Sequence, residues 1–245
     1  MKRTRTALAA PALVLVSALA LSACGGSGSA DGSSKDDKPK TSASPEKATD
    51  PAAELDRAVL STNEVKGFTV REPTKKYVFA ASQDQIKLDE PVCAPISYAT
   101  NQLPLGNPKA HLTRVAAGAE GPGTFTYVTL ATYANGEAKA ALAGLSKAVD
   151  SCGNGFTATS GKTNSPHTSV TAESVPAPKG ADESVAFRTT TKHQGVTHTL
   201  RAQTVRYGDT VAVYYAVDAM AFTQSRPGNA KVATAVMDAQ NAKLA

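Results

Sequence analysis

The sequence predicts an α+β fold: an antiparallel β-sheet with helices packed on one face, forming a single domain after a disordered tether. Three consecutive runs alternate apolar and polar residues, as half-buried strands do. The runs are residues 184–193, 196–207 and 210–218, joined by the pairs Gln194-Gly195 and Gly208-Asp209. Both pairs suit two-residue hairpin turns. Helical patterns occur before and after these strands, and this interspersion favours the α+β class.

The two turns make independent predictions of strand register. A two-residue turn at 194–195 places Phe187 opposite Ala202, and a turn at 208–209 places Ala202 opposite Tyr215. Both hairpins therefore put the same apolar residues on one face, which predicts an antiparallel meander with one buried face. The residues of that face are Val185, Phe187, Leu200, Ala202, Val211, Val213, Tyr215 and Val217.

Residues 1–23 have the layout of a lipoprotein signal peptide. A basic start, MKRTRT, precedes an apolar run that contains a proline and is short for a helix spanning the bilayer. Residues 21–24, LSAC, resemble the lipobox of bacterial lipoproteins, in which a diacylglyceryl group is attached to the cysteine and the signal is removed. We therefore expect Cys24 to carry a lipid that holds the protein at the outer face of the cytoplasmic membrane. The alternative is a plain cleavable signal in which Cys24 occurs by chance.

The next two segments differ sharply in composition. Residues 24–50 are rich in Gly, Ser, Asp, Lys and Pro, so they are expected to stay disordered as a tether. Residues 51–245 are long enough for one sizeable core and make up the folded domain. The formal net charge is +5, and three basic side chains of the signal peptide account for most of it. No Lys/Arg cluster with interleaved aromatics is present, so nucleic acid is not an expected partner.

Caps, spacing and β-propensity predict the other elements of the domain in order. They are a helix from Asp50-Pro51, strands GFTV and YVFAA, a helix from Asp89, a strand at 124–133, a helix from Asn135 to Gly153, weaker strands FTATS and SVTAESV, and a last helix from about Asn229. The helix that ends at Gly153 carries its apolar residues on one face. Cys152 lies at the end of that face, toward the core.

Two cysteines remain once Cys24 is assigned to the lipid. In an exported domain Cys93 and Cys152 are expected to form a disulfide. Such a bond closes a loop of about 60 residues, worth roughly 4 kcal/mol in the chain-entropy model. The alternative is two buried free thiols. No further ligands with suitable spacing surround these cysteines, so neither a metal nor any other cofactor is expected.

Two segments resemble a known family. ATYANGEAKAALAGLSKAVDSCGNGF joins a strand to an Ala-rich helix ending in Ser-Cys-Gly, and ADESVAFRTTT…LRAQTVRYGDTVAVYYAV follows after a spacer. Residues 55–245 are similar to the extracellular sensor domain of mycobacterial PknH-type Ser/Thr kinases and to related actinobacterial lipoproteins. The resemblance implies a sheet with helices around a cleft, two disulfides, and binding or sensing in the envelope. Here only Cys93 and Cys152 are available for a bridge, and there is no kinase domain, so a signalling role would need a partner protein.

Common catalytic motifs are absent from the sequence, which has no Gly-x-Ser-x-Gly, His-Glu-x-x-His, Cys-x-x-Cys or Walker A pattern. His193 and His198 share a face near a hairpin tip, where exposed histidines are expected, and two ligands without a carboxylate are too few for a metal. We therefore expect a non-enzymatic domain that binds an envelope ligand or a partner protein. The alternative is a cell-envelope hydrolase with an unrecognised active site.

One pair on the polar face of the meander is a candidate ligand site. The predicted register places Arg188 opposite Arg201, and Gln203 pairs with Tyr214 one step along the same face. Two like charges directly across a strand pair repel by up to about 1 kcal/mol. Both side chains could turn into water, or a loop carboxylate such as Glu183 could lie between them. Alternatively, Arg188 and Arg201 grip a carboxylate or phosphate, with Tyr214 offering its hydroxyl and ring.

Overall fold

The computed structural model describes residues 50–75, 78–118 and 123–245. The predicted signal peptide, the lipid site at Cys24 and the tether before residue 50 lie outside the described residues. Lys47–Ala245 is one compact unit. It contains the sheet and the two hydrophobic clusters described below, which is what a domain needs to fold on its own. Within the described part of the chain, no helix is long and apolar enough to cross a membrane.

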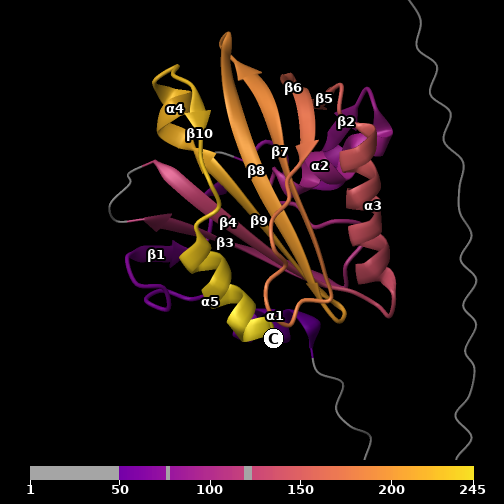
Figure 1. Cartoon of the computed structure of the whole chain (residues 1–245), viewed down its shortest axis with the longest axis vertical. Helices are drawn as coiled ribbons and strands as arrows, with labels where there is room; N and C mark the ends of the chain where they lie inside the picture. Colours follow the sequence, from indigo (N-terminus) through magenta and orange to yellow (C-terminus); the bar gives the residue numbers. More distant parts are fainter. Residues whose placement is uncertain (1–49, 76–77, 119–122) are drawn as a thin grey trace, which may run out of the picture. The chain divides into compact units, whose positions relative to one another are not determined.

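A ten-stranded sheet runs through the domain (Figure 1). Its order is β1-β3-β4-β9-β8-β7-β6-β5-β2, and neighbours along this path are antiparallel. The strands are β1 (Phe68–Arg71), β2 (Ile86–Leu88), β3 (Ala110–Gly118), β4 (Thr124–Thr132), β5 (Phe156–Ser160), β6 (Thr163–Ala172), β7 (Glu183–His193), β8 (Val196–Tyr207), β9 (Thr210–Asp218) and β10 (Gly228–Asn229). The predicted antiparallel α+β class is confirmed.

Strands β7, β8 and β9 form the meander in the predicted register. Phe187 pairs with Ala202, and Ala202 pairs with Tyr215. At the first turn Gln194 and Gly195 have φ values of 51° and 81°. A two-residue turn of type I′ requires positive φ at both positions, and this turn matches the right-handed twist of the strands. The local turn therefore sets the pairing of two long strands.

After β9 the chain leaves the sheet and returns to it as β10. Asp218 caps the short helix α4, where its Oδ1 accepts a hydrogen bond from the Ala221 N–H at 2.9 Å. Strand β9 pairs with residues 201–207 of β8 and leaves the earlier part of β8 without this neighbour. Strand β10 then pairs in parallel with His198 and Thr199, the next part of β8. This return places Asn229 and the residues that follow it beside β8.

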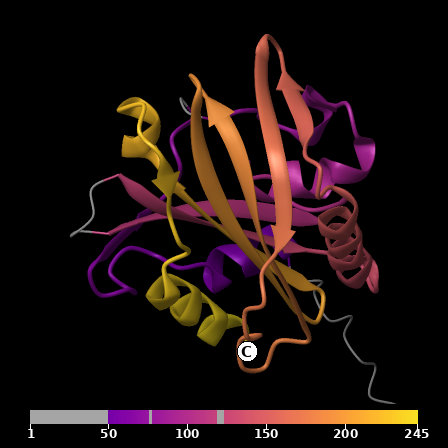
Figure 2. The same cartoon turned by 45° about the horizontal axis from the view of Figure 1, so that its top comes forward.

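Helices cover both faces of the sheet rather than the one face expected (Figure 2). The helices are α1 (Pro51–Ala58), α2 (Ala94–Ala99), α3 (Glu137–Ser151), α4 (Ala219–Thr223) and α5 (Thr234–Leu244), with the 3₁₀ turns η2 (Gln83–Gln85) and η3 (Pro91–Cys93). Successive residues of β9 point to opposite faces. Val213 lies in the cluster with α2 and α3, and Tyr214 lies in the cluster with α1 and α5. Because β9 is apolar on both sides, both faces need a covering.

Several elements differ from the sequence-based expectations, and four of them show why. Residues 78–81 of the predicted strand YVFAA form no strand. Strand β3 was not predicted, because three alanines and a glycine give it little β-propensity. Gly136 rather than Asn135 is the N-cap of α3. Helix α5 begins at Thr234 rather than near residue 229, because Gly228–Asn229 is used as β10.

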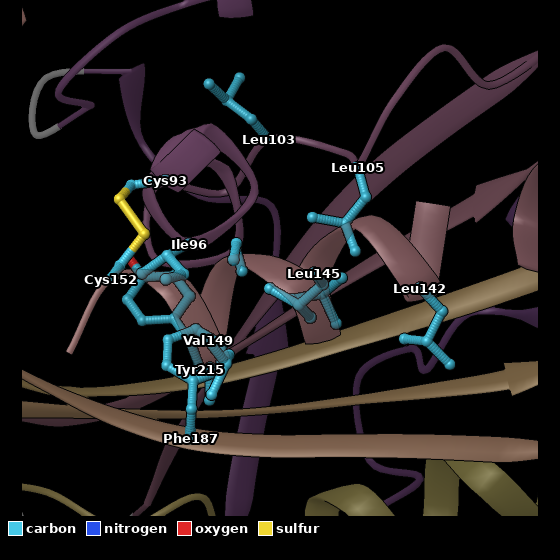
Figure 3. Close-up of a cluster of buried hydrophobic side chains, with 14 of the residues drawn as sticks. Cys93, Ile96, Leu103, Leu105, Leu142, Leu145, Val149, Cys152, Phe187 and Tyr215 are labelled. Carbon is cyan, nitrogen blue, oxygen red and sulfur yellow. A yellow bond between two sulfur atoms is a disulfide. The ribbon is translucent and has the colours of Figure 1, made fainter. Parts of the chain in front are cut away.

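A disulfide joins η3 to the end of α3 (Figure 3). The Cα atoms of Cys93 and Cys152 are 5.9 Å apart, and both residues are buried. The predicted pairing is confirmed. In Figure 3 the side chains of Phe187 and Tyr215 rise from the sheet toward α3. The covalent bond therefore closes the helical layer over this face, which we call the closed face (β-sheet residues packed against α2 and α3).

Helix α5 is fixed against the end of α1 by hydrogen bonds. Gln240 Oε1 accepts from the Leu60 N–H, and Gln240 Nε2 donates to the Ala58 carbonyl, each at 2.9 Å. Lys243 Nζ donates to the Val59 carbonyl at 2.9 Å. These bonds satisfy backbone groups where α1 ends. They hold the C-terminal half of α5 against the end of α1, and the N-terminal end of α5 forms one side of the groove described next.

Candidate functional site

A groove of about 570 Å³ opens between the end of β6, strands β7 and β8, and the segment that leads into α5. It lies on the face of the sheet that α1 and α5 cover. Both arginines of the predicted pair line it, together with Glu173 and Lys231. The candidate ligand site of the sequence analysis is therefore part of a concave surface.

Strand register arranges the floor of the groove in rows. Arg188 pairs with Arg201, and Ala186 pairs with Gln203 two residues along. The Glu173 N–H donates to the Ala186 carbonyl at 2.8 Å, so the chain after β6 continues beside β7. Residues two apart in a strand share a face. The arginine row and the Ala186–Gln203 row consequently face the same side, with the Glu173 residue beside the second row.

Glu173 links the two arginines. Its Oε1 accepts from Arg201 Nε at 3.1 Å and lies 3.7 Å from Arg188 Nη1. Arg201 Nη1 also donates to Asn229 Oδ1 on β10. A carboxylate thus lies between the arginines, as one of the alternatives held, but Glu183, the example expected there, pairs with another arginine of β8.

The groove carries more positive than negative charge. Its described lining includes three cationic side chains, Arg188, Arg201 and Lys231, and a single carboxylate, Glu173. The side chain of Arg188 is 46% exposed, whereas that of Arg201 is 20% exposed. Lys231 makes no ion pair with any described residue of the chain. Arg188 and Lys231 are therefore the cations most open to a ligand.

Tyr214 does not line the groove, which corrects its expected role. It pairs with Gln203 as predicted. Helix α5 covers it, so the ring is fully buried and its hydroxyl donates to Asn241 Oδ1 at 2.6 Å. Burial raises the pKa of this phenol well above its ordinary value. The hydroxyl is neutral and already bonded, and it offers nothing to a ligand.

Another polar pair on the sheet, His167 and Thr189, has the groups of a base and a nucleophile but no access. His167 Nδ1 lies 2.9 Å from Thr189 Oγ1, and the imidazole stacks on Phe156. Thr189 is fully buried and also donates to the Ser169 carbonyl. Burial lowers the pKa of His167 to about 4. A substrate cannot reach this pair, so it is part of the core.

His198 is buried rather than exposed at the hairpin tip. Phe222 of α4 stacks on its ring with centroids 3.8 Å apart, while His193 remains exposed. The cause is the detour of the chain through α4, which the strand pattern does not reveal. No group of three His, Cys, Asp or Glu residues suited to a metal occurs in the described ranges.

Sequence reasoning missed three residues at the groove: Glu173 and Asn229, which bond to Arg201, and Lys231, which lines the groove. A strand was predicted around Glu173, but the long connection to β7 leaves the register between β6 and β7 open. A short turn between β6 and β7 would have set that register. Asn229 and Lys231 were assigned to the last helix, and nothing in their local pattern indicates the return to β8.

No family model matches the chain, and no curated protein matches it. Among solved structures, the crystal structure of the extracellular domain of PknH from Mycobacterium tuberculosis is similar, with a TM-score of 0.48 and 11% identity over 79% of this chain and 95% of that chain. An uncharacterized protein (Rv0999 ortholog) from Mycobacterium smegmatis has a TM-score of 0.36 and 13% identity over 80% of this chain and 95% of that chain. The first of these structures is from the kinase family that the sequence resembles.

Proposed function

We propose that this protein is a lipid-anchored, non-enzymatic binding protein of the cell envelope whose groove takes up an anionic group, a carboxylate or a phosphate. The observation that carries the proposal is the Arg188–Arg201 pair. The two residues lie directly opposite each other across β7 and β8 at the groove, and one carboxylate, Glu173, is shared between them. Like charges in this position are unfavourable by up to about 1 kcal/mol. Glu173 balances one of the two charges, so the pair keeps a net positive charge that a bound anion can neutralise.

The geometry supports recognition by guanidinium groups. Arg201 is held by Glu173 on one side and Asn229 on the other, so its orientation is set before a ligand arrives. Arg188 lines the groove and is half exposed, and the contact of its Nη1 with Glu173 is longer, at 3.7 Å. Guanidinium forks match the geometry of carboxylate and phosphate and bind them in bidentate fashion. Lys231 adds a third cation on the opposite wall.

Calorimetric titration of the oxidised Lys47–Ala245 domain with inorganic phosphate and with acetate tests the anion site. The double variant Arg188→Gln, Arg201→Gln is expected to bind at least tenfold more weakly. The double variant Arg57→Gln, Arg226→Gln is the matched control, because both arginines lie outside the groove and their loss removes the same two charges. Equal affinity in the double variant and the unchanged domain would contradict the proposal.

The lipid on Cys24 is the second part of the proposal. It is supported by the order of basic start, apolar run and LSAC in residues 1–24. The tether would then keep the domain near the outer face of the cytoplasmic membrane, where anionic head groups and wall polymers are abundant. Several acyl chains together anchor a protein stably.

Intact-mass analysis of the full chain extracted from membranes checks the anchor. The expected species begins at Cys24 and carries the added mass of the lipid, and Cys24→Ala is expected to release the protein or block its processing. An unmodified Cys24 in the membrane fraction would show that the protein is held there in another way.

A further inference from the structure

We infer that the ligand of the groove is an anionic amphiphile, a molecule in which one apolar chain ends in a carboxylate or a phosphate. The inference rests on the proposed function, since the charged end would bind at Arg188 and Lys231. The inference adds the class of ligand to the proposed function, and it is argued from the apolar side chains that line the same groove.

The groove has apolar side chains beside its cations. On the β6 side, Val175 lines it with a side chain that is 41% exposed. On the α5 side, Val232 and Met237 line it and are partly buried against the hydrophobic cluster of α1 and α5. Most exposed apolar side chains occur singly, and an apolar surface within a groove is typical of a ligand site. These three side chains offer a ligand an apolar wall on each side.

The arginine row and Val175 are separated by a distance that one short chain can span. Thr171 pairs with Arg188 in the arginine row, and Val175 follows four residues later. An extended strand covers that separation in at most about 14 Å. Between the arginine row and Val175, Gln203 Nε2 donates to Ser184 Oγ at 3.2 Å, so these polar groups are partnered within the protein. The middle of the groove therefore suits a methylene chain better than a second charged group.

Glu173 shows which chemical group the arginine pair binds. Its carboxylate lies 3.1 Å from Arg201 Nε and 3.7 Å from Arg188 Nη1. Arg188 and Lys231 also line the groove, and Lys231 makes no ion pair with a described residue. The Glu173 carboxylate lowers the positive potential that attracts a ligand. Glu173→Gln is therefore expected to bind the charged head several-fold more tightly, because the neighbouring negative charge is removed.

Four probes distinguish the contribution of the charged head to binding from that of the apolar chain. Decyl phosphate and decanoate, below their critical micelle concentrations, carry the two heads, inorganic phosphate lacks the chain, and decyl maltoside lacks the charge. Calorimetric titration of the Lys47–Ala245 domain is expected to show decyl phosphate or decanoate bound at least tenfold more tightly than inorganic phosphate and than decyl maltoside. The two decyl anions distinguish a phosphate head from a carboxylate head.

Two matched pairs of variants assign the binding to the groove. Arg188→Gln is expected to weaken decyl phosphate at least fivefold and Arg226→Gln to leave it unchanged. Val175→Asn is expected to weaken decyl phosphate and leave inorganic phosphate unchanged. Val92→Asn is its control, because Val92 is a comparably exposed valine at η3, at 38%.

The outcomes separate the inference from the proposed function. If inorganic phosphate binds at the arginines as tightly as the better of the two decyl anions, the amphiphile inference fails and the anion site stands. If decyl maltoside binds as tightly as decyl phosphate, the groove is a general apolar surface and the inference also fails. If no anion binds, both the inference and the proposed anion site fail.

Discussion

The two faces of the sheet are built by the same strands and differ in how they are covered. On the closed face, α2 and α3 pack over buried aliphatic and aromatic side chains, and the disulfide joins that layer at Cys93 and Cys152 (Figure 3). On the other face, α1 and α5 cover the sheet only in part, and the groove remains beside the N-terminal end of α5. We call this second side the groove face.

Two consecutive residues of β7 show the consequence of this difference. Phe187 is fully buried on the closed face, and Arg188 is 46% exposed on the groove face. Since neighbouring residues in a strand point to opposite sides, one strand supplies core packing to one face and a cation to the other. The closed face thus provides rigidity to strands whose opposite sides are available for binding.

Substitution at this pair is expected to have the largest effect and to separate the faces most clearly. Phe187→Ala should lower the free energy of unfolding by about 3–5 kcal/mol, because it removes a fully buried aromatic ring and leaves a cavity. Arg188→Ala should change it by less than about 0.5 kcal/mol, because the side chain is partly solvated. Urea denaturation followed by circular dichroism measures both. Similar losses for the two variants would show that the groove face is also a packing face.

Loss of the disulfide is the next largest expected effect. Cys93→Ala, Cys152→Ala should lower the free energy of unfolding by roughly 4 kcal/mol, because the unfolded chain regains the entropy of a loop spanning 59 positions. Phosphate affinity, measured well below the melting temperature, should stay within twofold of the unchanged domain. A tenfold loss of affinity in the folded variant would show that the two faces are coupled.

Acid is expected to destabilise the domain through His167. Its pKa is about 4 in the folded protein, below the ordinary value near 6.5, so the unfolded chain binds the proton more tightly. Stability from this residue is complete above about pH 6.5 and is lost as the pH falls toward 4, by about 3 kcal/mol. His167→Gln should remove that part of the pH dependence, and His193→Gln, at an exposed position, should not. Urea denaturation at pH 7 and pH 4 gives the loss of unfolding free energy on acidification. Equal losses in the wild type and in His167→Gln would contradict this prediction.

Much of the groove floor could be predicted from the sequence, because a two-residue turn links strand register to local chemistry. The turn at Gln194-Gly195 brings Arg188 opposite Arg201, and the structure has that pairing. The walls could not be predicted in this way. Glu173 reaches the arginines through a connection long enough to leave its register open, and a detour of the chain after β9 brings Lys231 to the lining of the groove.

Tyr214 illustrates the same limit on the groove face. Its place in β9 follows from the second turn, and it pairs with Gln203 as expected. Its burial depends on α5, which Gln240 fixes against the end of α1, almost the whole length of the domain away in sequence. A short turn sets strand pairing from the local sequence, whereas tertiary packing decides which residues a helix covers. The second helical layer was missed for the same reason.

The central claim is that the groove face, and not the closed face, binds an anion. Amide chemical-shift mapping of the ¹⁵N-labelled Lys47–Ala245 domain during titration with inorganic phosphate tests it most directly. The account predicts saturable shifts that cluster at the end of β6, at Arg188 on β7, at Arg201 on β8 and around Lys231, and no saturable shifts in α3. Saturable shifts centred on α3 and the disulfide, or none in the arginine row at phosphate concentrations that shift other residues, would contradict it.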